Sequence, residues 1–410
     1  MGRGRMVRVR PTDEQFQAAW PRVVRTLAAW SGSLDDAEEY AAEAFARAVA
    51  QDRVDDLAAW CVRVAQRAWI DEHRREEVLT RIAPQVARAE VGPEMIEPSD
   101  GIEDRVALLF VACDDVLSAG SRMVLALRVV CGLPLADVAR HLGISQTTAA
   151  ARLTRAKKTL AQARGEFRVP GPHERYARLP TAAECVAGLF TIAHRAGFDP
   201  PDALGDTGAQ ALSLADALVA LHPDAAEVRG LRAVVRLGLA RRPGRVDEDG
   251  VALTLAEVDR SRWDHRLVRL GLADATAASV GHGRFALEAA ISGLHSVAPT
   301  FADTDWPRIV QLYGALERVW PSPAVTVARL SARAQVEDLD ALPGVERELH
   351  AIATDGPAYA RRDAGFALAD LCWRTGRRAA AAERYRGLLT EVDSEPVRRF
   401  CERRIAGAGS

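Results

Sequence analysis

The chain has 410 residues, which is too many for one hydrophobic core, so we expect two or three domains. Its 48% hydrophobic and 6% aromatic residues, with few β-branched runs, favour an all-α protein. The net charge of −2 gives no global sign of a nucleic-acid or membrane partner, and no apolar run approaches the ~20 residues that span a bilayer.

The N-terminal sequence MGRGRMVRVRPTDEQF is basic but lacks the apolar segment of a secretory signal, so we expect a cytoplasmic protein. Its six cysteines would then lie in a reducing compartment. They are scattered along the chain, without a CxxC pair or a histidine at ligand spacing. We therefore expect buried thiols, with no metal site and no cofactor.

The small net charge conceals two local charges of opposite sign. Residues 76–115 contain ten acidic residues and three arginines, whereas residues 121–168 contain nine basic and two acidic residues. The acidic stretch includes VGPEMIEPSDG, whose prolines and glycines indicate an irregular linker. We therefore predict a helical unit over residues 10–76, an acidic linker over 77–102 and a basic helical unit over 103–165.

The first element with a functional pattern is a predicted amphipathic helix over residues 34–49. Its Phe45 is expected to point inward, while its acidic side chains point outward and offer a docking face to a basic partner. The residues that we assign to docking by this helix are Asp36, Glu38, Glu39, Glu43 and Phe45.

The next predicted element is one long helix over residues 56–76, in which cations are interleaved with two tryptophans. This combination suits unstacked bases as well as phosphates. The residues that we predict for such a contact are Trp60, Arg63, Gln66, Arg67, Trp69, His73, Arg74 and Arg75. The alternative is a solvated helix face whose tryptophans belong to the core.

The stretch LADVARHLGISQTTAAARLTRAKKTL, residues 135–160, predicts a helix-turn-helix. Gly143 can adopt the positive φ that ends the first helix, and Ser145 is a suitable N-cap for the second. Apolar residues then recur at i, i+4, i+7 and i+11, which predicts one buried stripe. The residues of this stripe are Ala149, Leu153, Ala156 and Leu160.

The second helix of this motif carries both lysines of the chain, Lys157 and Lys158, and we expect the pair to lie off the core. Short polar residues at its N-terminus can reach base edges, and the cations further along can contact phosphates. The residues that we predict for this contact are Ser145, Gln146, Thr147, Thr148, Arg152, Arg155, Lys157 and Lys158. The alternative is that these cations only compensate the helix dipole.

Beyond FRVPGPHERYARLP the chain consists of amphipathic helices separated by short turns, which predicts a helical-repeat domain over residues 172–410. In the last pair, Arg374–Thr375–Gly376 joins two helices. Small residues such as Gly365 and Ala382 would allow these helices to approach closely, with Tyr385 packed between them. This pair resembles a tetratricopeptide repeat.

Three segments, taken in order, resemble an extracytoplasmic-function sigma factor. DDAEEYAAEAFARA, AAWCVRVAQRAWIDEHRR and LADVARHLGISQTTAAARLTRAKKTL are similar to its core-binding helix, its promoter-melting helix and its reader of the upstream promoter element. RRPGRVDEDGVALTLAEVDRSRWD and HSVAPTFADTDW also resemble the C-terminal extension of one subgroup, which bears tetratricopeptide-like repeats.

The resemblance implies a sigma factor that binds core RNA polymerase and directs it to promoter DNA, with no membrane partner. The helix over 34–49 would dock on the polymerase, residues 60–75 would engage the −10 element, and residues 145–158 would enter the major groove at the −35 element. The acidic linker would lie in a basic channel built for RNA. The extension would make a regulatory contact with the polymerase or with the sigma domains of its own chain.

One alternative is an enzyme, because acidic residues gather in two segments of the extension and could bind a metal or run acid–base chemistry. These residues are Asp247, Asp249, Glu257, Asp259, Asp264, Asp303 and Asp305. The chain has no HExxH, GxSxG, P-loop or GxGxxG motif. We therefore favour a protein that is not an enzyme. In it these acids cap helices and pair with Arg260, Arg262 and Arg266, while Trp263 and Trp306 anchor the core.

The other alternative is a one-component helix-turn-helix regulator whose repeat domain senses a partner. Such a protein would bind its operator without RNA polymerase. It would have no use for the acidic helix or for the helix that combines arginine with tryptophan.

Overall fold

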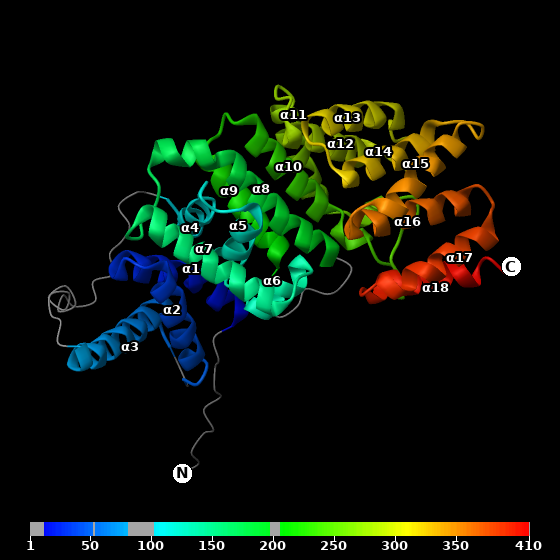
Figure 1. The fold of residues 1–410 in the computed structure, drawn as a ribbon. Coiled ribbons are helices and arrows are strands. Elements are labelled where there is room, and N and C mark those ends of the chain that lie inside the picture. Colours follow the sequence, from blue (N-terminus) through cyan, green and yellow to red (C-terminus); the bar gives the residue numbers. More distant parts are fainter. Residues whose placement is uncertain (1–11, 52–53, 81–101, 197–205, 410) are drawn as a thin grey trace, which may run out of the picture. The chain divides into compact units, whose positions relative to one another are not determined.

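The structure of the chain, a computed structural model, is helical. The residues that it describes are 12–51, 54–80, 102–196 and 206–409. Within them the regular elements are helices, apart from one isolated antiparallel bridge between Val246 and Ala252, so the predicted all-α fold is confirmed (Figure 1). No helix within these ranges is both long enough and apolar enough to cross a bilayer.

The chain divides into two compact units, and each is described here by itself. The first comprises Met1–Leu189 with Asp202–Gln210, and the second comprises Phe190–Pro201 with Ala211–Ser410. The predicted segments 10–76 and 103–165 therefore belong to the same unit. The predicted linker over 77–102 lies almost wholly outside the described residues, which end at Thr80 and resume at Ile102.

Among the described residues, the first unit contains seven helices, the greater part of an eighth and the first turn of α9. These helices are α1 Asp13–Ser31, α2 Leu34–Ala48, α3 Leu57–Thr80, α4 Asp104–Ala112, α5 Ala119–Leu125, α6 Leu135–Leu142, α7 Gln146–Arg164 and α8 Pro172–Ala196. A π-helical turn, Ala126–Val130, directly follows α5.

Helices α1 to α3 form a bundle with an aromatic core. Trp20 of α1 is 1% exposed, and its ring lies 5.5 Å from that of Phe45 in α2. Phe16 packs edge-on against Phe45 with 4.7 Å between the ring centroids. The indole Nε1 of Trp20 donates to the carbonyl of Val129 at 3.0 Å, so the same core holds the chain segment that precedes α6.

Helix α4 lies at the centre of the rest of the first unit. Every residue from Val106 to Ala112 is buried, as expected for a short helix that is apolar on all sides. Arg178 of α8 donates to the carbonyl of Phe110 at 3.0 Å. The first turns of α8 are thus part of this unit, whereas the sequence pattern assigned everything from residue 172 onward to the extension.

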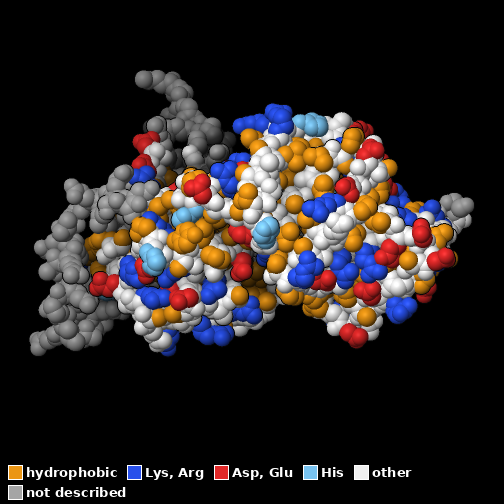
Figure 2. Space-filling model, turned by 90° about the horizontal axis from the view of Figure 1, so that it is seen from above, with side chains coloured by type: hydrophobic (Ala, Val, Ile, Leu, Met, Phe, Trp, Pro, Cys, Tyr) orange, Lys and Arg blue, Asp and Glu red, His pale blue; other side chains and the backbone are white. Residues whose placement is uncertain are grey.

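The second unit consists of helices joined by short turns. They are the end of α8, α9 Thr207–Leu221, α10 Ala226–Ala240, η3 Arg242–Gly244, η4 Arg260–Arg262, α11 His265–Ala278, α12 Arg284–Val297, α13 Trp306–Val319, α14 Pro323–Val336, α15 Leu342–Asp355, α16 Ala358–Arg374, α17 Arg378–Leu388, η5 Leu389–Glu391 and α18 Glu395–Ala406. On the face shown in Figure 2, basic, acidic and hydrophobic side chains are interspersed.

The last helices of the second unit pack as their small residues predict. Gly376 has a φ of 77° in the turn between α16 and α17, where glycine is favoured. A Cβ on Gly365 would approach Leu388 to 2.9 Å, so glycine permits this close crossing. Tyr385 is 1% exposed and meets Phe400 of α18 edge-on at 5.7 Å, which extends the core beyond the pair.

Candidate nucleic-acid interface

Helices α6 and α7 form the predicted helix-turn-helix. Gly143 follows α6 with a φ of 62°, in the left-handed region that favours glycine. The hydroxyl oxygen of Ser145 accepts a hydrogen bond from the amide of Thr148 at 3.1 Å, so Ser145 is the N-cap of α7. The predicted buried stripe is observed in full, at Ala149, Leu153, Ala156 and Leu160.

The exposed face of α7 carries polar and basic side chains. Its exposed residues before Leu160 are Gln146, Thr147, Ala151, Thr154, Arg155 and Lys158. Most of them recur three or four positions apart, so they share one face of the helix. Thr154 was missed by the sequence analysis, although helical spacing counted from Thr147 would have found it. Two predicted residues, Thr148 and Arg152, are half-buried.

Lys157 is buried, so the expectation that both lysines lie off the core is wrong for this residue. Its side chain is 8% exposed, and its Nζ donates to Glu38 Oε2 at 2.6 Å and to Asp35 Oδ1 at 2.7 Å. Burial lowers the pKa of Lys157, but the charge of Glu38 and the hydrogen bonds to Asp35 and Glu38 outweigh this effect and leave the pKa raised. Lys158, one residue further round the helix, is exposed.

Glu38 is the partner of this lysine, and its predicted outward position is also wrong. Its side chain is 8% exposed and accepts a second hydrogen bond from Arg128 Nε at 2.6 Å. Burial would raise the pKa of Glu38, but the charges of Arg128 and Lys157 hold it below its ordinary value. The reason for the error is tertiary, because α7 covers the flank of α2 on which Glu38 lies.

Three acidic side chains of α2 are exposed, although one of them, Asp35, also pairs with Lys157. They are Asp35, Glu39 and Glu43, which are four residues apart and therefore form one stripe. Asp35 was missed by the sequence analysis, although this spacing identifies it. Phe45 points inward as expected, so it lies in the core and is not on the docking surface.

Helix α3 carries an exposed, mainly cationic stripe. Arg63, Arg67 and Arg74 are exposed, and their spacing of four and seven residues places them on one face, which the exposed Asp71 shares. Trp60 and Gln66, which were predicted to join them, are half-buried. The side chain of Arg75 lies outside the described residues.

Trp69 and His73 hold α3 to its neighbours. The ring of Trp69 lies 4.8 Å from that of Trp30 in α1, and its Nε1 donates to the Asp36 carboxylate of α2 at 3.2 Å. The imidazole of His73 stacks on Trp69 with 3.7 Å between the ring centroids. Trp69 is half-buried and packs against Trp30, and Asp36 is engaged within the bundle.

Comparison with known proteins agrees with this geometry. Residues 110–160 match the family sigma-70, region 4, and residues 178–279 match a family of unknown function, DUF6596. A Rhizobium meliloti (strain 1021) protein, described as "Uncharacterized protein R00370", is 32% identical over 341 residues, which cover 80% of this chain and 81% of that protein. The chain belongs to the family of that protein, and it carries a sigma-70 region 4 domain. No solved structure matches the chain.

The sigma region 4 domain gives residues 110–160 a sigma-factor-like role in DNA binding or transcription. It spans the helix-turn-helix and the Asp114 segment before it. This type of domain is a transcription-factor domain without catalytic activity of its own. The match to residues 178–279 begins within α8 and covers the first helices of the second unit.

The region 4 domain is fixed to α8 through Asp114. The Asp114 carboxylate is 3% exposed and accepts hydrogen bonds from Arg164 Nε at 2.9 Å and from Arg178 Nη2 at 2.6 Å. Burial would raise its pKa, but the Arg164 hydrogen bond, the Val116 amide and the charge of Arg178 hold it well below the ordinary value. One carboxylate therefore joins three segments of the first unit.

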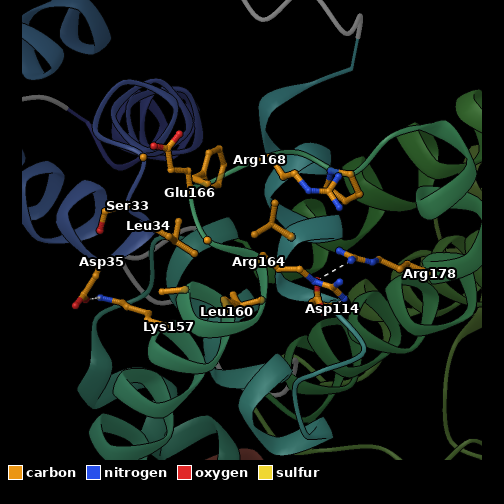
Figure 3. A pocket seen from close by; sticks show the side chains of 16 residues that line it. Ser33, Leu34, Asp35, Asp114, Lys157, Leu160, Arg164, Glu166, Arg168 and Arg178 are labelled. Carbon is orange, nitrogen blue, oxygen red and sulfur yellow. Dashed lines mark hydrogen bonds and ion pairs between the residues drawn. The ribbon is translucent and has the colours of Figure 1, made fainter. Parts of the chain in front are cut away.

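A hollow of about 110 Å³ lies between Asp114 and the α1–α2 turn. Figure 3 shows Arg164 and Arg178 converging on Asp114 at one side of it and Lys157 reaching Asp35 at the other. Arg168 lies near its rim and pairs with Glu174 at 2.6 Å. The labelled cations around this hollow are thus paired with carboxylates of the same unit.

Most of the acidic residues that suggested an enzyme have structural roles. Asp259, Asp264 and Asp305 accept hydrogen bonds from backbone amides at the starts of η4, α11 and α13. Asp247 accepts from the amides of Asp249 and Val251 and pairs with Arg403, and Glu257 pairs with Arg403 and Arg404. Among the described residues no group of three or more acids, histidines or cysteines is arranged to hold a metal ion.

Proposed function

We propose that this chain is a sigma factor of the extracytoplasmic-function type, which binds core RNA polymerase and directs it to promoters. The observation that carries the proposal is a combination within one compact unit. A region 4 domain packs with a separate bundle, α1 to α3, which presents both a cationic stripe and an acidic stripe. A regulator that binds DNA through its helix-turn-helix alone needs neither stripe.

Each exposed stripe has a role in this proposal. The exposed face of α7, with Arg155 and Lys158, enters the major groove at the −35 element. The cationic stripe of α3, with Arg63 and Arg67, contacts DNA at the −10 element. The acidic stripe of α2 docks on a basic surface of the polymerase, and residues beyond the first unit form a regulatory helical-repeat domain.

In this proposal the structure described above is a closed state, in which α7 is held against α2. The Lys157–Glu38 pair holds α7 against α2, so Lys157 is not available to phosphate and Glu38 is not available to the polymerase. The −10 and −35 elements are about 25 base pairs apart, which is roughly 85 Å of duplex at ~3.4 Å per base pair. Engagement of both elements therefore requires that α7 separate from α2, which exposes Lys157 and Glu38.

Transcription with purified components tests the proposal. The full chain is added to sigma-free core polymerase and a library of genomic fragments, and the opened fragments are sequenced. We expect a defined set of start sites that share two elements. Selective binding of the chain to DNA without polymerase, with no fragment opened in its presence, would instead support the one-component regulator.

Variants that remove positive charge test the role proposed for each cationic surface. Arg155→Ala with Lys158→Ala is expected to weaken binding of the polymerase complex to promoter duplex by about tenfold or more and to reduce its salt dependence. Arg63→Ala with Arg67→Ala is expected to reduce strand opening more than duplex binding. Arg308→Ala is the matched control, because Arg308 is exposed on α13 and donates to Gln311 of the same helix.

To test the role of the second unit, a truncated chain must leave the first unit intact. A chain that ends at residue 171 loses Arg178, which is bonded to Asp114, so it would damage the first unit as well. A chain that ends at Gln210 retains every segment of the first unit. Higher transcription from this chain would show inhibition by the second unit, and lost transcription from a folded chain would show that the unit is required.

A further inference from the structure

The second unit contains a cluster of two arginines, a histidine and a tyrosine that has no matching set of carboxylates among the described residues. Its members are Arg241, Arg260, His295 and Tyr313, here called the Arg241 cluster. Arg241 follows the last residue of α10, and Arg260 begins η4. The amide of Asp264 donates to the carbonyl of Ala240 at 2.9 Å, so these two turns of the chain lie against each other.

Helices α12 and α13 supply the other side of the cluster. Arg260 Nη1 donates to the carbonyl of His295 at 2.9 Å and to that of Ala298, which holds it at the end of α12. The guanidinium of Arg260 also lies over the ring of Trp263, 5.1 Å from its centroid. Tyr313 packs in the apolar cluster that joins α12 to α13, within electrostatic range of Arg241.

Several donors in and around the cluster have no partner in the described part of the chain. Arg260 Nη2, His295 Nδ1 and Trp263 Nε1 are buried and make no hydrogen bond there. The side chain of Arg241 makes neither a hydrogen bond nor an ion pair with any described residue. An unsatisfied buried donor costs about 1–3 kcal/mol, so such a group in a native protein indicates a bound water or ion.

The electrostatics of the cluster show uncompensated positive charge. Burial lowers the pKa of Arg241, and Arg260 lowers it further while Tyr313 opposes this. Burial, with the charges of Arg241 and Arg260, lowers the pKa of His295 to about 4, so the imidazole is neutral at pH 7. Each of the four residues is partly exposed, although the unpartnered donor atoms of Arg260 and His295 are themselves buried.

The acidic groups near the cluster do not neutralise it. Glu288, on the same face of α12 as His295, pairs with Arg284 at 2.9 Å. Asp303 opposes the lowered pKa of Arg260, but it is exposed and accepts a hydrogen bond from Thr300 at 2.7 Å. Neither carboxylate forms an ion pair with Arg241 or Arg260 in the described residues.

We propose that the Arg241 cluster binds an oxyanion, phosphate or carboxylate, carried by a small molecule. Guanidinium groups donate several N–H bonds in a planar fork that fits such oxyanions. The anion accepts from Arg260 Nη2 and from His295 Nδ1–H, and its charge offsets that of Arg241. A half-buried set of four side chains fits one anionic group, whereas a nucleic acid or an acidic peptide needs an extended row of cations. The site lies in the second unit and does not depend on the proposed sigma activity.

Binding to the full-length protein tests this proposal. Sodium phosphate and sodium acetate are titrated separately at pH 7 by calorimetry and by thermal unfolding, with sodium chloride at equal ionic strength as the reference. We expect saturable binding and a rise in Tm with at least one oxyanion. Phosphate alone identifies a phosphoryl ligand, and acetate alone or both anions identify a carboxylate or a general oxyanion site. Equal behaviour in all three salts would overturn the proposal.

Two variants distinguish loss of the binding site from the general effect of removing one positive charge. Arg241→Met is expected to weaken oxyanion binding at least tenfold and still fold, because this side chain bonds to no described residue. Arg308→Met, which removes an exposed arginine of α13, should bind as the unaltered chain does. Equal loss in both variants, or no loss in Arg241→Met, would contradict the assignment.

A spectroscopic measurement on the unaltered chain is independent of any variant. The imidazole of His295 is followed by nuclear magnetic resonance during the phosphate titration. A nearby anion favours the protonated ring, so the pKa of His295 should rise from about 4 when the site is filled. An unchanged pKa at saturation would place the anion elsewhere. Short DNA or a glutamate-rich peptide could also displace phosphate at a concentration lower than that of phosphate itself. That result would overturn the proposal of a small molecule and identify the polymer as the ligand.

Discussion

The paired carboxylates of the first unit and the Arg241 cluster of the second unit treat buried charge differently. In the first unit, Glu38 and Asp114 are almost fully buried, and each accepts hydrogen bonds from two cationic side chains. In the second unit, Asp274 is buried and paired in the same way with Arg232 and Arg236, but Arg241, Arg260 and His295 are partly buried without paired carboxylates in the described residues. A desolvated charge is tolerated when a partner offsets its cost. The paired clusters therefore hold helices together, and the unpaired cluster is left able to bind an anion.

The largest effect is expected from a variant that breaks a paired cluster. Glu38→Ala leaves Lys157 buried with only Asp35 and leaves Arg128 without its carboxylate partner. Removing one partner of a buried ion pair costs about 3–5 kcal/mol. We expect the free energy of unfolding of the first unit to fall by about this amount, measured by denaturant unfolding and by amide exchange in α2 and α7.

Two further variants show whether the loss comes from the unpaired lysine. Glu39→Ala removes a neighbouring acid from the exposed stripe of α2 and should change the free energy by less than about 0.5 kcal/mol. Adding Lys157→Met to Glu38→Ala removes the stranded charge and should recover much of the loss. A double variant that is no more stable than Glu38→Ala would contradict this explanation.

Acid should affect the two units in different pH ranges. The pKa of His295 is lowered from 6.5 to about 4, so the folded second unit resists a proton that the unfolded chain accepts. The resulting stability is complete above pH 6.5 and is lost as the pH falls toward 4, by at most about 3 kcal/mol. The lowered pKa of Glu38 has the same sign, but its contribution is lost only below about pH 4.5.

Thermal unfolding at pH 7, 5 and 3.5 measures this separation. The transition of the second unit should shift between pH 7 and 5, before that of the first unit. His295→Gln should remove most of the shift between pH 7 and 5. A shift of equal size in this variant would assign the acid sensitivity to another group.

The sequence predicted the local features of the first unit and missed its tertiary ones. Gly143, Ser145 and the buried stripe of α7 follow from helix periodicity and capping, which involve residues close in the chain. The partners of Lys157 lie 119 and 122 residues away. Periodicity shows which face of a helix is polar, but it does not show whether another helix covers that face.

The same limit applies to the second unit. The carboxylates at Asp259, Asp264 and Asp305 were predicted to cap helices, and they do, because capping is local. These acids were also predicted to pair with Arg260, Arg262 and Arg266, and that prediction is wrong, because Asp247 and Glu257 pair with Arg403 and Arg404 instead. Arg241 was assigned no role, since a sequence does not show that a cation lacks a partner. That property emerges only when the surroundings of each side chain are known.

A smaller effect distinguishes an unpaired cation from a paired one. Arg241→Met removes a partly buried charge that has no partner among the described residues, so it should leave the stability unchanged or raise it by up to about 1 kcal/mol. Arg178→Met leaves Asp114 with Arg164 alone and should be clearly destabilising. Both are measured by denaturant unfolding without added oxyanion. A loss for Arg241→Met as large as that for Arg178→Met would show that Arg241 has a structural role.

The smallest effect is expected at Asp115, one of two neighbouring carboxylates that share one arginine. Arg164 Nη2 lies 2.8 Å from Asp114 and 2.6 Å from Asp115, yet the side chain of Asp114 is 3% exposed and that of Asp115 is 80% exposed. Because water screens an exposed pair, Asp115→Asn should cost less than about 0.5 kcal/mol, whereas Asp114→Asn should cost several times more. Equal losses in denaturant unfolding would mean that pairing with Arg164, rather than burial, sets the strength of this cluster. Unequal losses would show that burial makes a matched charge important, as the comparison of paired and unpaired clusters requires.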